Sequence, residues 1–195
     1  MERQEEESHP FTPYIPEGAQ ILMLGTFPPK SDKWSMPFYY PNWINDMWRI
    51  MGIVFFDDAQ HFVLPGRKAF DQDMICDFLC RTGIALFDTA QQVRRLKDNA
   101  SDKFLEIVEP VNLNEILTSH SSITAVVTTG EKAASVVAEI THSPLPKMGE
   151  SCTVQYCGRS ITHHRMPSTS RAYPMNIYKK AEFYRSMLAK YDIHL

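Results

Sequence analysis

The hydrophobic and polar positions of this chain fall into two alternating patterns. Short apolar runs recur, and such runs are typical of strands buried on both faces of a parallel sheet. Between them, apolar residues spaced three and four apart predict helices. The apolar runs cover residues 21–26, 84–87, 123–129 and, with more polar side chains, 160–166. The helical spacing covers residues 44–51, 131–140 and 177–191, and the lysines of the last stretch fall outside its apolar face.

The order of these elements predicts an α/β fold in which helices cover both faces of a parallel sheet. In such sheets, ligands bind outside the carboxyl ends of the strands. Function is therefore expected in the loops that follow Gly25, Asp88, Thr129 and Met166. Asn42 precedes the first predicted helix and is a candidate for its N-cap.

The size and composition of the chain suit one domain. Its 195 residues, 44% of them hydrophobic, are enough for one sizeable core. We expect residues 1–18 to form an acidic, proline-containing N-terminal extension and residues 19–195 a single domain. No apolar run approaches the roughly 20 residues that span a bilayer, and residues 1–8 lack the apolar core of a secretory signal. A cytoplasmic protein that does not enter membranes is expected.

Charge is divided unevenly along the chain, whose formal net charge is -3. Residues 1–8 hold four acidic side chains and one basic, whereas residues 158–190 hold seven basic and one acidic. A basic C-terminal face on an acidic body is typical of a protein that binds a polyanion, because phosphate contacts are local. A solvated helix face would give the same pattern.

Aromatic side chains are concentrated in the loop after the first predicted strand. Phe38, Tyr39 and Tyr40 follow one another there. They would either offer a planar ligand a surface to stack on or form a satellite hydrophobic cluster under a long loop.

The loop after the last predicted strand combines hydroxyl and guanidinium groups. The hydroxyl groups belong to Ser168, Thr169 and Ser170, and the guanidinium groups to Arg165 and Arg171. Such donors predict a phosphodiester clamp. The alternative is a Ser/Thr-rich turn after a strand in which His163 and His164 alternate between core and solvent.

Several common site types do not match the sequence. There is neither a complete P-loop nor a Gly-x-Ser-x-Gly nucleophile elbow. The four cysteines, at positions 76, 80, 152 and 157, match no regular zinc spacing and are expected to be free thiols. No metal and no cofactor are expected.

Two segments far apart in the chain together resemble the signature segments of the uracil-DNA glycosylase superfamily, most closely its hypoxanthine-DNA glycosylase branch. The first is Leu-Gly-Thr-Phe-Pro at 24–28, with Tyr-Tyr-Pro at 39–41 and Asn-Asp-Met-Trp at 45–48; the second is Arg-Met-Pro-Ser-Thr-Ser at 165–170. Residues 83–88 also look like the family's second strand. The resemblance implies a three-layer α/β/α fold with a four-stranded parallel sheet and DNA bound across its carboxyl edge. The implied reaction is hydrolysis of the N-glycosidic bond of a deaminated base, hypoxanthine or uracil, in base excision repair.

The resemblance also implies roles for individual residues near the base. In most branches a carboxylate or amide two residues after the motif glycine orients the attacking water, but Phe27 stands there. The hypoxanthine branch shares this substitution, and its water-orienting amide corresponds to Asn45, with Asn42 as the next choice. The residues implied to surround the flipped base are Gly25, Thr26, Phe27 and Tyr40, of which Tyr40 would stack on it.

Contacts with the DNA backbone are implied for the remaining motif residues. They are Pro28, Arg165, Ser168, Thr169, Ser170 and Arg171. Met166 and Arg171 stand where the branch has Leu and Pro, so the resemblance leaves the preferred base open. We expect a monomeric, monofunctional glycosylase whose partner is DNA containing a deaminated base. The alternatives are a non-catalytic nucleic-acid-binding protein on the same fold and an α/β protein that binds a small molecule.

Overall fold

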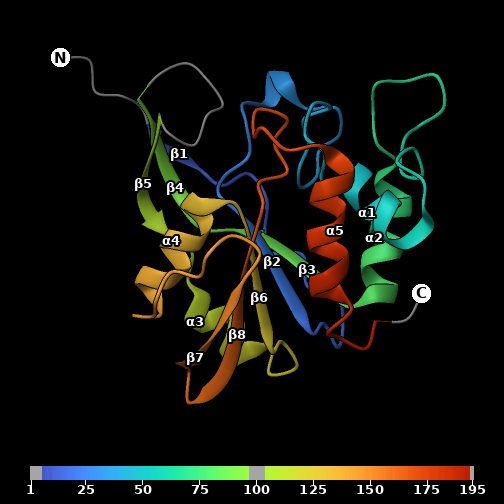
Figure 1. Cartoon of the computed structure of the whole chain (residues 1–195). Coiled ribbons are helices and arrows are strands. Elements are labelled where there is room, and N and C mark those ends of the chain that lie inside the picture. The colour runs from blue at the N-terminus through green and yellow to red at the C-terminus, as the bar shows by residue number, and fades with distance from the viewer. Residues whose placement is uncertain (1–5, 97–103, 194–195) are drawn as a thin grey trace.

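A five-stranded sheet forms the centre of the protein in the computed structural model, which describes residues 6–96 and 104–193 (Figure 1). The strands lie in the order β3-β2-β6-β8-β7. They are β2 (Ile21–Gly25), β3 (Ile84–Asp88), β6 (Ala125–Thr129), β7 (Ser151–Tyr156) and β8 (Arg159–Met166). Strands β3, β2, β6 and β8 run parallel to one another, which confirms the four-stranded parallel sheet.

The fifth strand, β7, is an addition to the predicted sheet. It pairs antiparallel with β8 at the sheet edge. The two strands are joined by Cys157 and Gly158, which have φ angles of 52° and 72°. A two-residue turn with positive φ at both positions matches the twist of the strands it connects. Because β7 is mostly polar and only partly buried, no apolar run marks it in the sequence.

Helices cover both faces of the central sheet and complete the three layers (Figure 1). The helices α1 (Met47–Phe56), α2 (Gln72–Thr82) and α5 (Ile177–Leu188) lie on one side, and α3 (Leu113–Ser119) and α4 (Glu131–Ile140) on the other. A short 3-10 helix, η1 (Ser31–Lys33), lies in the loop after β2. In the described residues no helix has the length and apolar character needed to cross a membrane.

Helix α1 begins later than the apolar spacing predicts. The Asn45 side-chain oxygen accepts the Met47 N–H at 2.9 Å, next to the start of the helix, whereas the Asn42 oxygen accepts the Ile44 N–H at 3.1 Å. The prediction that Asn42 caps the helix and that Ile44 lies on its apolar face is therefore wrong, and Ile44 is 56% exposed. The reason is tertiary, because Asn45 pairs with Ser170 of a distant loop.

A second, smaller sheet includes the start of the described chain. Its antiparallel strands are β1 (Glu6–Ser8), β4 (Ala90–Arg95) and β5 (Leu105–Pro110), in the order β1-β4-β5. An ion pair of 2.8 Å joins Arg95 to Glu7. After β1 the chain continues along the outer edge of β3, where Tyr14 forms a β-bridge with Leu86.

Strand β8 is buried on both faces of the sheet at its two consecutive histidines. His163 and His164 are each 1% exposed, so the alternation between core and solvent proposed for them is wrong. Nε2 of His163 lies 3.1 Å from the Thr128 hydroxyl, and Nε2 of His164 lies 2.6 Å from the Tyr191 hydroxyl. Burial lowers the pKa of each ring to about 4, so both histidines are neutral near pH 7.

Candidate functional site

The four parallel strands end at one edge of the sheet, and the loops after them meet there. Gly25 ends β2 beside Asp88, which ends β3. A Cβ atom added to Gly25 would lie 2.4 Å from Oδ1 of Asp88. A larger residue would therefore displace the carboxylate, so this close approach requires glycine.

Tyr40 stands at the same edge in a left-handed backbone conformation, with φ of 51°. This conformation is uncommon for residues other than glycine. The Tyr40 hydroxyl lies 3.3 Å from Oγ1 of Thr129, the last residue of β6. Burial raises the pKa of this hydroxyl, and the Asp88 carboxylate adds to the effect, so the group stays protonated at neutral pH. Phe38 and Tyr39 are instead buried in the main hydrophobic core, so they form neither a free stacking surface nor a separate satellite cluster.

The loop after β2 pairs with the loop after β8. Asn45 forms an antiparallel β-bridge with Ser170, and the Asp46 N–H donates to the Thr169 carbonyl at 2.9 Å. The bond from the Met47 N–H fixes the orientation of the Asn45 amide, because only the oxygen can accept it. No described residue hydrogen-bonds to the Asn45 amide nitrogen. The amide is thus held in place. Its two N–H groups and the second lone pair of its oxygen are left for a water molecule.

Residues 168–171, which we call the serine turn, present two oriented hydroxyl groups. The hydroxyls of Ser168 and Ser170 each accept the backbone N–H two residues further on, at 3.2 Å. A hydroxyl that accepts one bond still has its proton to donate, and within the described chain neither serine donates it. Thr169 is buried. Ser168 also lies against Gly130, where an added Cβ would be 3.5 Å from the Ser168 Cβ.

The two arginines that flank the serine turn have different partners. The Arg171 Nε donates to Oδ1 of Asp46 at 2.9 Å, and the side chain remains 46% exposed. Arg165 forms an ion pair of 2.7 Å with Glu131 at the start of α4 and donates to the Pro146 carbonyl at 3.2 Å. The structure therefore brings Arg171, but not Arg165, onto the loop that carries Asn45.

Among the residues that follow Gly25, Phe27 faces the smaller sheet. Thr26 and Pro28 are buried. The Phe27 ring lies 5.2 Å from the His9 ring and 5.7 Å from the Arg95 guanidinium carbon. The structure therefore directs Phe27 towards the smaller sheet, so its apolar ring takes no part in orienting a water beside Asn45.

One buried pair at this edge has no counterpart in the predicted site. Nε2 of His9 lies 2.9 Å from Oδ2 of Asp88, and the two side chains are 4% and 8% exposed. The His9 ring contacts those of Phe27 and Phe87, with the Phe87 centroid 4.7 Å away. Asp88 could have been found from its position at the end of an apolar run. His9 could not, because it precedes Asp88 by 79 residues and belongs to no motif.

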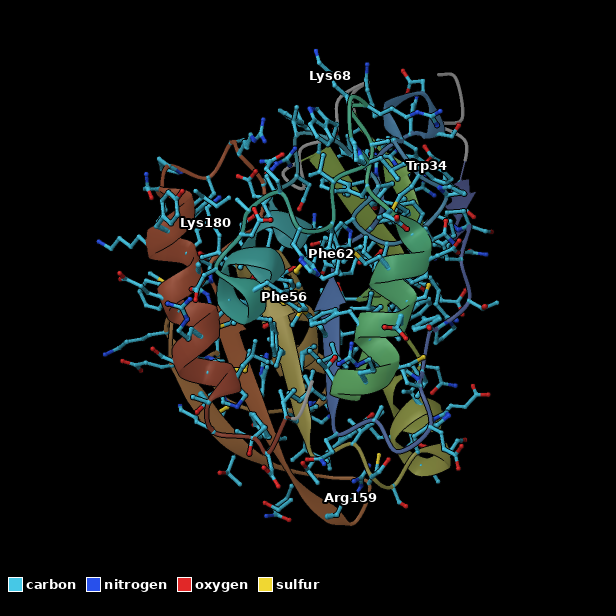
Figure 2. The ribbon with its side chains drawn as sticks, turned by 90° about the vertical axis from the view of Figure 1, so that its right-hand side faces the viewer. Trp34, Phe56, Phe62, Lys68, Arg159 and Lys180 are labelled. Atoms are coloured by element: carbon cyan, nitrogen blue, oxygen red, sulfur yellow. The ribbon has the colours of Figure 1, made fainter. Side chains whose placement is uncertain are left out.

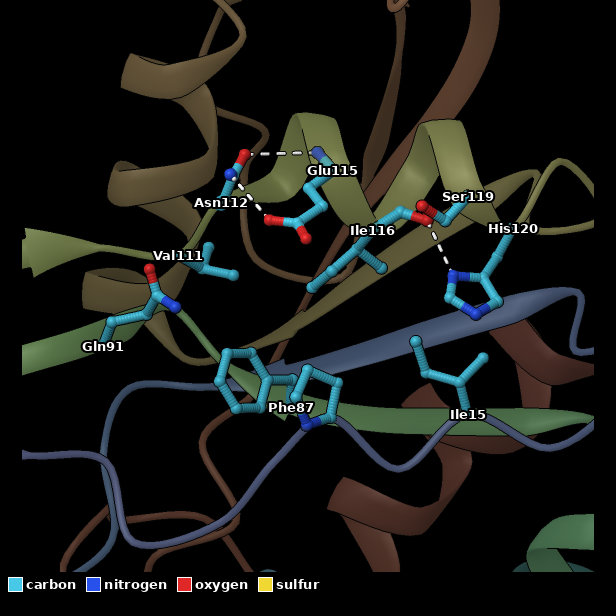
Figure 3. Close-up of a pocket in the computed structure, with 10 residues that line it drawn as sticks. Ile15, Phe87, Gln91, Val111, Asn112, Glu115, Ile116, Ser119 and His120 are labelled. Atoms are coloured by element: carbon cyan, nitrogen blue, oxygen red, sulfur yellow. Dashed lines mark hydrogen bonds between the residues drawn. The ribbon is translucent and has the colours of Figure 1, made fainter.

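A cavity of about 420 Å³ lies elsewhere, between the segment 13–15, the end of β3 and helix α3 (Figure 3). No residue of the serine turn and none of the loop residues 40–46 lines it. Two of its polar groups are bound within α3 or at its cap, because Glu115 accepts from Asn112 and His120 binds the Ile116 carbonyl, both at 2.9 Å. The cavity is therefore separate from the two loops that carry Asn45 and Ser170.

Comparison with known proteins supports the fold. Neither protein-family models nor curated protein sequences give a significant match. Among solved structures, the chain is similar to the solution NMR structure of a protein from Methanosarcina acetivorans, provisionally described as a uracil DNA glycosylase. The TM-score is 0.60 at 18% identity, over 92% of this chain and 98% of the other. The three-layer α/β/α arrangement implied by the sequence resemblance is thus confirmed, and the protein has a uracil-DNA glycosylase-like fold.

Proposed function

We propose that this protein is a monofunctional DNA glycosylase that hydrolyses the N-glycosidic bond of a deaminated base, hypoxanthine or uracil. The observation that carries the proposal is the β-bridge between Asn45 and Ser170, which joins the two motif loops at the carboxyl edge of the sheet. One motif would supply the water-orienting amide and the other the phosphate donors. Both are needed at one place for a reaction on a nucleotide in DNA.

The end of this edge formed by β2 and β3 suits an extruded base. A base inside a duplex is out of reach and must be flipped out, which costs least when it is mispaired. The Tyr40 ring would stack on the base, and the Asp88 carboxylate, which can only accept hydrogen bonds, would receive a base N–H. Hypoxanthine and uracil carry an N–H beside a carbonyl on their pairing edge, whereas adenine and cytosine carry an unprotonated nitrogen there.

The chemistry needs an oriented water more than a strong nucleophile. As the C–N bond breaks, the sugar becomes oxocarbenium-like, the base departs with the bonding electrons, and water adds to the sugar carbon. The Asn45 amide oxygen would accept a hydrogen bond from that water and hold it in line. The products would be the free base, which takes up a proton, and an abasic site.

Base release from oligonucleotides tests the proposal directly. Labelled single strands and duplexes carrying deoxyinosine or deoxyuridine are incubated with the protein and then cleaved with alkali at abasic sites. Scission at a deaminated base, and none in the undamaged strand, is expected. Salt-dependent DNA binding without scission on any deaminated base would instead support the non-catalytic nucleic-acid-binding alternative.

A further inference from the structure

Four charged side chains gather in and beneath the serine turn, and we call them the Asp46 cluster. They are Asp46, Arg49, Arg171 and Lys180. Asp46 Oδ1 lies 2.9 Å from Arg171 Nε and 3.8 Å from Arg49 Nη1. Lys180, in the first turn of α5, donates from Nζ to the Ser170 carbonyl at 2.7 Å (Figure 2). Three cations thus share a single carboxylate.

The surplus positive charge of the Asp46 cluster is buried. Arg49 is 5% exposed and Lys180 1% exposed. Burial lowers the pKa of both groups; Arg171 adds to that effect and Asp46 opposes it. A buried cation without a full counter-charge is unfavourable. An anion placed nearby would therefore be attracted more strongly than by surface lysines, whose charge water screens.

The backbone of the serine turn is also held from the protein interior. Two of its carbonyl groups, and that of Pro167 just before it, accept hydrogen bonds from groups below: Pro167 from the Tyr184 hydroxyl at 2.9 Å, Thr169 from the Asp46 N–H at 2.9 Å, and Ser170 from Lys180 at 2.7 Å. The described residues contain no cis peptide bond. In a trans peptide the N–H points opposite to the carbonyl.

The outer side of the turn is consequently rich in donors. The N–H groups of Ser168 and Arg171 belong to peptides whose carbonyls are held inward, so they face away from the interior. The two serine hydroxyls keep their protons for an acceptor, and the Arg171 side chain is half exposed. Backbone N–H, hydroxyl and guanidinium donors together are what a phosphodiester binds.

We propose that Lys180, although buried and unable to touch DNA, is a positioning residue for one DNA phosphodiester: with Arg49 and Arg171 it supplies the charge that draws the phosphate onto the serine turn, and it holds the turn in its donor-presenting conformation. This inference rests on the proposed function in that it takes DNA as the partner. It does not depend on base release.

Lys180→Met tests the inference, with Lys179→Met as its matched control. Lys179 is the preceding residue of α5 and is exposed, so both variants lose the same charge from the same helix. Binding of a fluorescein-labelled undamaged duplex is measured by anisotropy over a range of KCl concentrations. Lys180→Met should bind about tenfold more weakly with a shallower salt slope, and Lys179→Met should remain within about twofold of the unmodified protein.

Asp46→Asn separates an electrostatic role from a merely structural one. The amide oxygen can still accept from Arg171, but the Asp46 cluster gains one positive charge. This variant should bind the duplex about threefold more tightly, opposite in sign to Lys180→Met. Weaker binding by both variants, or equal losses in the two lysine variants, would overturn the inference. Thermal melts establish that each variant is folded. If Lys180→Met does not fold, the change in duplex affinity of Asp46→Asn alone tests the electrostatic role.

The inference and the proposed function fail in different ways. Weaker duplex binding by Lys180→Met and tighter binding by Asp46→Asn, with no base release by the unmodified protein, would support the role of Lys180 and contradict the proposed glycosylase activity. Base release by the unmodified protein, with unchanged duplex affinity in Lys180→Met, would support the glycosylase activity and contradict the role of Lys180.

Discussion

The two ends of the carboxyl edge differ in their chemistry. At the β2 and β3 end, which we call the base end, Gly25, Tyr40 and the Asp88 carboxylate held by His9 offer rings and one hydrogen-bond acceptor. At the β8 end, the phosphate end, the serine turn offers donors above a cationic cluster. One end suits a neutral planar group and the other a polyanion. A nucleotide in DNA contains both, so under the proposed function the order of strands in the sheet would set the order of groups along the ligand.

Asn45→Ala is the variant with the largest expected effect, because Asn45 pairs with the serine turn and, under the proposed function, would orient the water that attacks the sugar. Its single-turnover rate of base release should fall about 100-fold or more, as loss of an oriented catalytic group does. DNA affinity, measured by anisotropy, should change little. Asn42→Ala, which removes an amide that binds only the Ile44 N–H among the described residues, is the control. Full activity of Asn45→Ala would move the water-orienting role elsewhere, with Asn42 next.

Gly25→Ala should damage the base end alone. The added Cβ would displace Asp88 Oδ1, which lies 2.4 Å away, while His9 holds the other oxygen. Misplacement of this size should lower the rate of base release by about 10-fold to 100-fold without changing affinity for undamaged duplex. Gly158→Ala, in the β7–β8 hairpin, is the control for a glycine-to-alanine change away from this edge, because its Cβ meets nothing within 4 Å; any cost of its positive φ has no counterpart at Gly25. If Gly25→Ala lost affinity for undamaged duplex by as large a factor as it lost rate, the two ends would not be separable.

Asp88→Asn is a smaller change at the base end. Replacing an obligate acceptor by an amide should cost about one net hydrogen bond, or roughly fivefold in the rate on deoxyinosine. His9→Phe keeps the ring among its aromatic neighbours but no longer holds the carboxylate, so it should shift the rate in the same direction. The measurement is the single-turnover rate of base release from a deoxyinosine oligonucleotide. An unchanged rate in Asp88→Asn would exclude Asp88 from base recognition.

The sequence was informative where the structure is locally determined. Three apolar runs became the buried strands β2, β3 and β6, and the stretch 177–191 became α5. The two motif loops, far apart in sequence, were expected at the same edge because parallel strands share it, and Asn45 does meet Ser170 there.

What the sequence could not predict depends on tertiary contacts. Strand β7 is polar and takes its place only through the hairpin with β8. Lys180 was assigned outside the apolar face of its helix, yet it is four residues before Tyr184 and is equally buried. An analysis of apolar spacing counts every lysine as polar. It therefore cannot predict a buried lysine that binds a carbonyl of another loop. His9 is a similar case, since its partner is set by the path of the N-terminal segment.

The position of His9 makes the placement of the Asp88 carboxylate depend on a few residues around β1. His9 directly follows β1, a three-residue strand at the margin of the smaller sheet. Short strands at the margin of a sheet open more readily than strands of a buried sheet. If the proposed function holds, loss of β1 and His9 would leave the Asp88 carboxylate without its partner, so the protein would discriminate less well among bases.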